Sequence, residues 1–175
     1  MHNNIEIKAR SSNQQAIRDL LKAHQANFKG IDHQIDTYFK VNQGRLKLRE
    51  GNIENSLIHY YRENQAGPKL SKVSLYQTSP GAGLKAVLSE ALGILVVVDK
   101  QREIYFIDNV KFHIDRVKDL GAFIEIEAID SDGTRSKEDL QQQCEYYLAL
   151  FGIREEELVE DSYSDLLAGL QSTKN

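Results

Sequence analysis

Residues 121–129 read GAFIEIEAI, and this stretch predicts a β-strand with two unlike faces. Its side chains alternate strictly, so Phe123, Glu125 and Glu127 share one face and three apolar residues share the other. The two glutamates would stand about 7 Å apart, where like charges repel unless water or a cation lies between them. Taken alone, this strand leaves open a solvated face or a charged interior.

Cations follow the same alternating pattern in other predicted strands. Residues 44–50 read GRLKLRE, which places Arg45, Lys47 and Arg49 on one face and two leucines on the other. Three cations on one strand face favour an anion or a carboxylate opposite them. Further strands are expected over residues 4–10, 34–39, 56–63, 69–76, 94–106 and 110–117.

The charged faces of these strands decide between the two interpretations. They would carry Glu6, Lys8, Arg10, Arg45, Lys47, Arg49, Arg62, Lys72, Lys100, Arg102, Lys111, Asp115, Glu125 and Glu127. Burying such charges unpaired in an ordinary core is prohibitive. The face is therefore solvated, or the sheet curls into a barrel around a wet, charged lumen. Such a lumen suits a polyanion with a divalent metal, because Lys and Arg bind phosphate oxygens and carboxylates bind Mg²⁺ or Mn²⁺.

Helices are expected between some of the strands, over residues 13–26, from Pro80-Gly81 to near Gly93, from Ser136 to Phe151, and over 163–170. The second helix would turn Leu84, Val87, Leu88 and Leu92 inward. Hairpin-like succession of about eight strands with three or four helices predicts an α+β fold with a largely antiparallel sheet.

Length and composition indicate one ordinary globular domain, expected over residues 1–170 with a flexible tail over 171–175. The formal net charge of −4 gives no reason to expect nucleic-acid binding. The longest apolar run, Ile94 to Val98, is too short for a membrane span, and the N-terminal MHNNIEIKAR lacks a signal-peptide core. The single Cys144 excludes an internal disulfide, suits a reducing cytoplasm and is expected in the core.

Six stretches together resemble the CYTH family, also called triphosphate tunnel metalloenzymes. They are NIEIK, GRLKLRE, YYRENQAGPK, KQREIYF, VKFHIDRVKDLGAFIEIE and SYSDLL, and they run from Asn4 to Leu167. The last four are most similar to the bacterial class IV adenylyl cyclase branch. The resemblance implies a closed antiparallel eight-stranded β-barrel, a tunnel flanked by helices.

The resemblance also implies roles for particular residues. Glu6 and Lys8 match the second acid and the lysine of the family's ExExK signature, whereas Asn4 replaces its first acid and removes one formal negative charge. Glu125 and Glu127 match the C-terminal acidic pair, so Glu6, Glu125 and Glu127 are the expected ligands of Mg²⁺ or Mn²⁺.

Triphosphate binding is expected from Lys8, Arg45, Lys47, Arg49, Arg62, Lys72, Lys100, Arg102 and Lys111. Lys111 stands where Arg is more usual, which keeps the charge but loses the planar fork. Lys8 and Asp115 are the expected catalytic residues, with Asp115 activating a nucleophile or holding metal-bound water.

The mechanism implied is metal-assisted attack on phosphorus. Attack by the ribose 3′-hydroxyl on the α-phosphorus of ATP would give cyclic AMP and pyrophosphate. Attack by water on the γ-phosphorus would make the protein a triphosphatase for tripolyphosphate, thiamine triphosphate or a nucleoside triphosphate. A third possibility is a non-catalytic binder of nucleotide or polyphosphate. The expected partner is a small-molecule triphosphate, with no nucleic acid or membrane, and the protein is expected to be a cytoplasmic monomer or homodimer.

Overall fold

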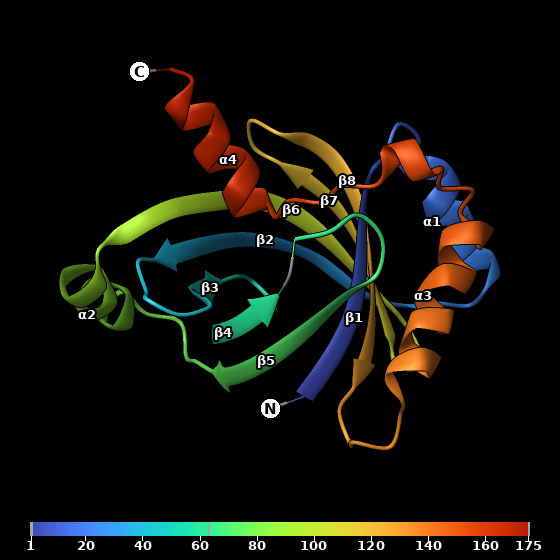
Figure 1. The fold of residues 1–175 in the computed structure, drawn as a ribbon, viewed down its shortest axis with the longest axis horizontal. Helices are drawn as coiled ribbons and strands as arrows, with labels where there is room; N and C mark the ends of the chain where they lie inside the picture. The colour runs from blue at the N-terminus through green and yellow to red at the C-terminus, as the bar shows by residue number, and fades with distance from the viewer. Residues whose placement is uncertain (1, 63, 175) are drawn as a thin grey trace.

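The alternating segments form eight antiparallel strands that close into a barrel in the computed structural model, which describes residues 2–62 and 64–174 (Figure 1). Around the barrel the strands follow the order β1-β5-β4-β3-β2-β6-β7-β8, and β8 pairs with β1 to complete the circle. They are β1 (His2–Arg10), β2 (Asn27–Phe39), β3 (Arg45–Glu50), β4 (Ser56–Arg62), β5 (Lys69–Gln77), β6 (Ile94–Ile107), β7 (Val110–Val117) and β8 (Gly121–Asp130). The predicted fold class is confirmed.

The register of β8 sets the neighbours of its two glutamates. Across from β1, Glu125 is paired with Lys8 and Glu127 with Glu6. Across from β7, Glu125 is paired with His113 and Glu127 with Lys111. Because side chains alternate along each strand, these groups point to the same side of the sheet.

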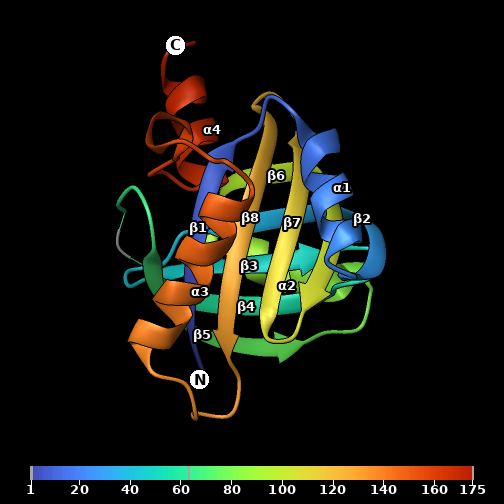
Figure 2. The ribbon, with the colours of Figure 1, turned by 90° about the vertical axis from the view of Figure 1, so that its right-hand side faces the viewer.

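The apolar faces of β1, β7 and β8 point out of the barrel, where two helices cover them (Figure 2). These are α1 (Gln14–Ala23) and α3 (Lys137–Leu150). Phe112 of β7 packs edge-on against Tyr147 of α3, with ring centroids 4.7 Å apart. The main apolar core therefore lies outside the barrel wall, which leaves the charged faces to line the interior.

A second apolar cluster closes one end of the barrel. Phe123 of β8 contacts Tyr163, the first residue of α4 (Tyr163–Ser172), with ring centroids 5.0 Å apart. The predicted last helix is confirmed and ends two residues later than expected, at Ser172.

Other local predictions have mixed outcomes. Cys144 is buried, as expected, and Ser136 and Asp139 form a capping box at the start of α3. The first helix is shorter than expected, and its N-cap is Asn13, whose side chain accepts the N–H of Ala16. The second strand begins at Asn27, earlier than expected.

The predicted inward packing of the second helix is wrong. Helix α2 (Ala82–Leu92) exists, but Val87 is 64% exposed and Leu84 37% exposed. Leu88 and Leu92 are only half-buried. Figure 1 shows the reason, because α2 connects β5 to β6 beyond one end of the barrel, away from the faces that α1 and α3 cover. No helix among residues 2–62 and 64–174 has the length and apolar character needed to cross a membrane.

Candidate active site in the barrel lumen

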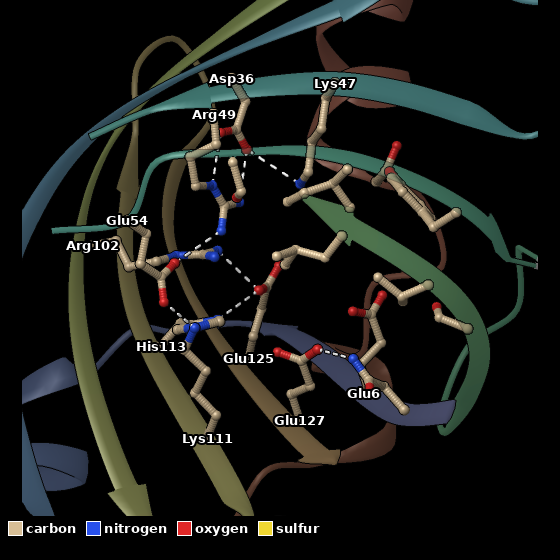
Figure 3. A pocket seen from close by; sticks show the side chains of 18 of the residues that line it. Glu6, Asp36, Lys47, Arg49, Glu54, Arg102, Lys111, His113, Glu125 and Glu127 are labelled. Atoms are coloured by element: carbon tan, nitrogen blue, oxygen red, sulfur yellow. Dashed lines mark hydrogen bonds and ion pairs between the residues drawn. The ribbon is translucent and has the colours of Figure 1, made fainter. Parts of the chain in front are cut away.

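The barrel encloses a polar cavity of about 470 Å³ into which charged side chains of both signs project (Figure 3). Its basic lining residues are Lys8, Lys47, Arg49, Arg62, Lys100, Arg102 and Lys111, and its acidic lining residues are Glu6, Asp36, Glu54, Glu125 and Glu127. The alternative of a solvated outer face is therefore wrong for these residues, because the charged faces line an interior.

Three of the predicted lumen cations lie elsewhere. Lys72 is exposed on the outer face of β5, because the inward positions of that strand are Ser71 and Val73. Arg45 lies at the rim, where its Nη2 donates to Asp165 of α4 at 2.8 Å. Arg10 is also absent from the lining, and its guanidinium stacks over the Phe123 ring, 5.0 Å from the centroid.

Asp36 of β2 is the centre of one charge cluster. Its carboxylate accepts Arg49 Nε at 2.9 Å and Arg49 Nη2 at 2.8 Å, Lys100 Nζ at 2.7 Å and Lys47 Nζ at 3.2 Å. Burial favours the neutral acid, but the three cations outweigh it and hold the pKa of Asp36 well below its usual value. Burial lowers the pKa of Lys100 to about 7, despite Asp36, with Arg102 and Arg49 adding to the effect.

Arg102 of β6 links a second cluster. Asp115 accepts its Nε at 2.8 Å and its Nη2 at 2.6 Å, and also accepts the Tyr163 hydroxyl at 2.7 Å. Glu125 accepts the same Arg102 Nη2 at 2.9 Å. Asp115 is fully buried behind Arg102 and is not among the lining residues, so its contacts suit orienting Arg102 rather than touching a substrate.

Lys8, the other expected catalytic residue, lies in the lumen wall beside this cluster. Its Nζ is 3.4 Å from Glu125 Oε1 and 4.1 Å from the centroid of the Tyr163 ring. Burial lowers the pKa of Lys8 below its usual value, although Glu125 and Glu6 oppose the shift.

The acids on β1 and β8 form a third group, which contains the expected metal ligands. Glu6 pairs with Arg62, and Asn4 Nδ2 donates to Glu127 Oε1 at 2.5 Å. Enclosure in the lumen, reinforced by Glu6 and Glu125, raises the pKa of Glu127. Asn4 Oδ1 is buried and has no hydrogen-bond partner among the residues described.

The oxygen-rich chemistry of this third group fits a hard divalent cation. An unsatisfied amide oxygen beside carboxylates that repel one another is stabilised by a cation. Within residues 2–62 and 64–174, no three acidic, His or Cys side chains form a ligand set as they stand. Glu6 and Glu125 are instead paired with Arg62 and Arg102, so a cation that used these carboxylates as ligands would compete with the two arginines.

Two acids and one histidine of the lumen, Asp36, Glu54 and His113, were not predicted as site residues. Asp36 had a signal, because Asp32, Gln34 and Asp36 alternate along β2. His113 also had a signal, because it alternates with Lys111 and Asp115 along β7. Its Nδ1 is 3.0 Å from Glu125 Oε2, and its Nε2 is buried without a hydrogen-bond partner among the described residues. Glu54 had no signal, because it lies in a loop without periodicity.

Comparison with known proteins agrees with this architecture. The family model described as the CYTH domain matches residues 2–163. The chain belongs to the CYTH domain family. A search of curated protein sequences gives no significant match.

Solved structures similar to this CYTH-domain protein include PH1012 from Pyrococcus horikoshii OT3, with 25% identity and a TM-score of 0.74, covering 95% of this chain and 99% of that chain. A candidate adenylate cyclase from Vibrio parahaemolyticus has 18% identity and a TM-score of 0.73, covering 94% and 97%. A candidate adenylyl cyclase from Hippeastrum, described as having a dominant triphosphatase activity, has 14% identity and a TM-score of 0.66, covering 98% and 96%. The last two likenesses establish the fold alone.

Proposed function

We propose that this CYTH-domain protein is a metal-dependent enzyme that acts on a triphosphate in the barrel lumen, with conversion of ATP to cyclic AMP and pyrophosphate as the first candidate reaction. The observation that carries the proposal is the convergence of seven Lys and Arg side chains on one enclosed cavity. Cations in a water-poor site stabilise charge that builds up on a phosphoryl group and its leaving group.

Internal carboxylates act as counter-ions of these cations when no substrate is bound. Arg62 Nε and Nη2 are buried and have no hydrogen-bond partner among the described residues, so donors remain for an incoming anion. A triphosphate that pairs with Arg62 and Arg102 would release Glu6 and Glu125 from them. The polyanion and the cation site are therefore expected to assemble together.

Glu6, Glu127 and the Asn4 amide oxygen, with Glu125 once it is released, are the residues proposed to hold Mg²⁺ or Mn²⁺. When bound, the metal would offset negative charge on the phosphate oxygens and help to orient them. Because Asn4 brings an oxygen without a charge, this site is expected to bind metal more weakly than one with a third signature carboxylate.

Positioning by the protein is the second contribution to catalysis. Asp115 and Tyr163 hold Arg102 in a fixed orientation, which places a preorganised guanidinium beside the phosphates. Lys8 of β1 also contacts Glu125 and projects into the lumen. Its expected role is to neutralise charge on the leaving pyrophosphate.

An apolar wall on one side of the lumen favours a substrate with an organic portion. Tyr38, Ile58, Tyr60 and Val73 line the cavity beside the cations of β3. Such a surface would remain unused by inorganic tripolyphosphate but can pack against a nucleoside. This supports a triphosphate with an organic group, such as ATP, over inorganic tripolyphosphate, and the adenylate cyclase name of the Vibrio parahaemolyticus neighbour agrees with ATP.

Triphosphate hydrolysis is the second candidate, because the same cations serve attack by water on the terminal phosphorus. It is favoured by the triphosphatase activity described for the Hippeastrum protein. Non-catalytic binding of a nucleotide or polyphosphate is the third candidate. It is supported by Asn4, because a neutral amide at the first signature position weakens the metal site that catalysis needs.

Product analysis distinguishes the three candidates. The protein is incubated with ATP, tripolyphosphate or thiamine triphosphate, each with Mg²⁺ or Mn²⁺, and the products are identified by phosphorus NMR. Cyclic AMP with pyrophosphate is the expected result for a cyclase, and orthophosphate indicates a triphosphatase. No turnover of any substrate would contradict an enzymatic function.

A further inference from the structure

Glu54 enters the lumen from a loop, whereas the other lining acids lie on strands. The loop of residues 51–55 joins β3 to β4. Glu54 Oε2 accepts Arg49 Nη1 of β3 at 3.1 Å, and Glu54 Oε1 accepts Lys111 Nζ of β7. Figure 3 shows the carboxylate projecting toward these cations inside the cavity.

The loop that carries Glu54 is held in a defined conformation by Asp32. The fully buried Asp32 carboxylate accepts the backbone N–H groups of Asn52, Ile53 and Glu54 at 2.6, 2.9 and 3.0 Å. Gly51 lies so close that a Cβ there would meet Asp32 Oδ1 at 2.6 Å. The backbone of the loop therefore holds Glu54 at the lumen. Its side chain can separate from Arg49 and Lys111 by rotation alone, without a change in the loop backbone.

A carboxylate between two cations occupies the place that a phosphate oxygen would take. Enclosure favours the neutral acid, but Lys111 and Arg49 outweigh it and lower the pKa of Glu54, so the group is ionised at neutral pH. Because it is tethered to the protein, its effective concentration at Arg49 and Lys111 is high. An anion that contacts only these two cations therefore competes poorly with it.

A longer polyanion is in a different position. While one of its phosphates displaces Glu54, the others contact cations that pair with other acids, such as Lys8, Arg62 and Arg102. These additional contacts offset the loss of the two ion pairs that Glu54 makes with Arg49 and Lys111.

We propose that Glu54 sets an affinity threshold for the tunnel: it is an internal competitor that a phosphate group must displace from Arg49 and Lys111, so that a short phosphate binds weakly whereas a triphosphate, which makes further contacts, still binds tightly. The inference rests on the proposed function, since it concerns the same lumen. It assigns a role to a residue outside the strand pattern.

The test measures anion affinity by isothermal titration calorimetry, without divalent metal and in the presence of EDTA. Wild type and Glu54→Gln are titrated with inorganic phosphate, pyrophosphate and tripolyphosphate. We expect Glu54→Gln to bind pyrophosphate about tenfold more tightly than wild type, as expected for removal of a close charge from the site. Tripolyphosphate displaces the same carboxylate, so its affinity should rise by a similar factor.

Glu50→Gln is the matched control, because Glu50 ends β3 but pairs with Lys85 of α2 at 3.4 Å and does not line the cavity. Its affinities should equal those of wild type. Glu54→Asp is the second variant, in case loss of the charge impairs folding. It keeps the charge but shortens the reach toward Lys111, and should give a smaller gain in the same direction.

The outcomes separate the inference from the proposed function. If wild type binds tripolyphosphate and Glu54→Gln binds every anion equally well or more weakly, the inference is wrong and the proposed function stands. If none of the proteins binds tripolyphosphate, either in EDTA or after Mg²⁺ is added in excess, the tunnel is no anion site and both fail. Tighter pyrophosphate binding by Glu54→Gln, with Glu50→Gln unchanged, supports the inference.

Discussion

Glu125 and Glu127 are neighbours on one strand face, yet their surroundings differ at the residue scale. Glu125 is compensated by Arg102, His113 and Lys8, which hold its pKa well below the usual value despite burial. Glu127 lies beside other acids and has a raised pKa; among residues 2–62 and 64–174 its one hydrogen-bond donor is the Asn4 amide. The Glu125 carboxylate therefore neutralises buried cations. The Glu127 carboxylate is electrostatically unfavourable in its ionised form, and a bound metal ion would stabilise it.

This difference predicts opposite effects of two otherwise equivalent substitutions in metal-free protein. Glu127→Gln removes repulsion and should leave the free energy of unfolding unchanged or raise it. Glu125→Gln removes a compensating charge beside Arg102 and should lower the free energy of unfolding by about 1–3 kcal/mol. Urea unfolding at neutral pH measures both, and equal effects of the two variants would argue against this division.

Lys100 predicts a pH dependence of ligand binding. With a pKa of about 7 in the free protein, Lys100 loses its proton as the pH rises through neutrality, and a bound polyanion favours the protonated form. Triphosphate binding at pH 8 should therefore take up protons, and affinity should fall as the pH rises above 7. Calorimetry in two buffers with different ionisation enthalpies measures this uptake. The Lys100→Met variant should take up fewer protons, and undiminished uptake would contradict the assignment.

At the scale of elements, the more apolar of two helices is the less buried one. Helix α3 buries Leu140 and Cys144 against the outer face of the barrel. Helix α2 exposes Leu84 and Val87 and, within the described part of the chain, has no fully buried side chain. An apolar stripe stabilises the fold only where the topology supplies a facing surface.

We therefore expect Val87→Ser to change the free energy of unfolding by less than about 0.5 kcal/mol. Leu140→Ala should lower it by about 2–5 kcal/mol, because it leaves a cavity in the core. Chemical denaturation of both variants gives the comparison. A large loss of stability in Val87→Ser would show that α2 packs more closely than its exposure indicates.

At the scale of the whole molecule, closure of the barrel places charged side chains inside and a large part of the apolar core outside the barrel wall. The apolar strand faces lie outward under α1 and α3, and the charged faces surround the cavity. Internal ion pairs make this arrangement tolerable, because buried charges are stable only when compensated.

This arrangement predicts strong stabilisation by a matching ligand. A ligand that binds only the closed barrel stabilises the fold, so we expect tripolyphosphate with Mg²⁺ to add about 2.7 kcal/mol at a concentration 100 times its dissociation constant. Thermal unfolding should show a raised melting temperature, and sodium sulfate at equal ionic strength serves as the control. An unchanged melting temperature at millimolar tripolyphosphate would count against a tunnel site.

Much of the site could be predicted from sequence because strand alternation is a local property. The inward positions of Lys8, Lys47, Arg49, Arg102 and Lys111 follow from a period of two within single segments. Lys72 was assigned to the wrong face because β5 has apolar residues on its inward side, which the alternation alone cannot distinguish from an outward side.

By itself the sequence determined the strands, their two unlike faces and the seven cations of the lumen, since each depends on residues close together in the chain. It also determined the resemblance to the CYTH family, which depends on the order of short stretches along the chain. Only the tertiary structure decided which charges pair. Asp36 meets Lys100 across 64 positions of sequence, and Lys111 meets Glu54 across 57. Barrel closure and the conformation of a loop without periodicity determine these partners. The same topology places α2 where no facing apolar surface buries it. These outcomes depend on long-range register and topology, which no local pattern of residues encodes.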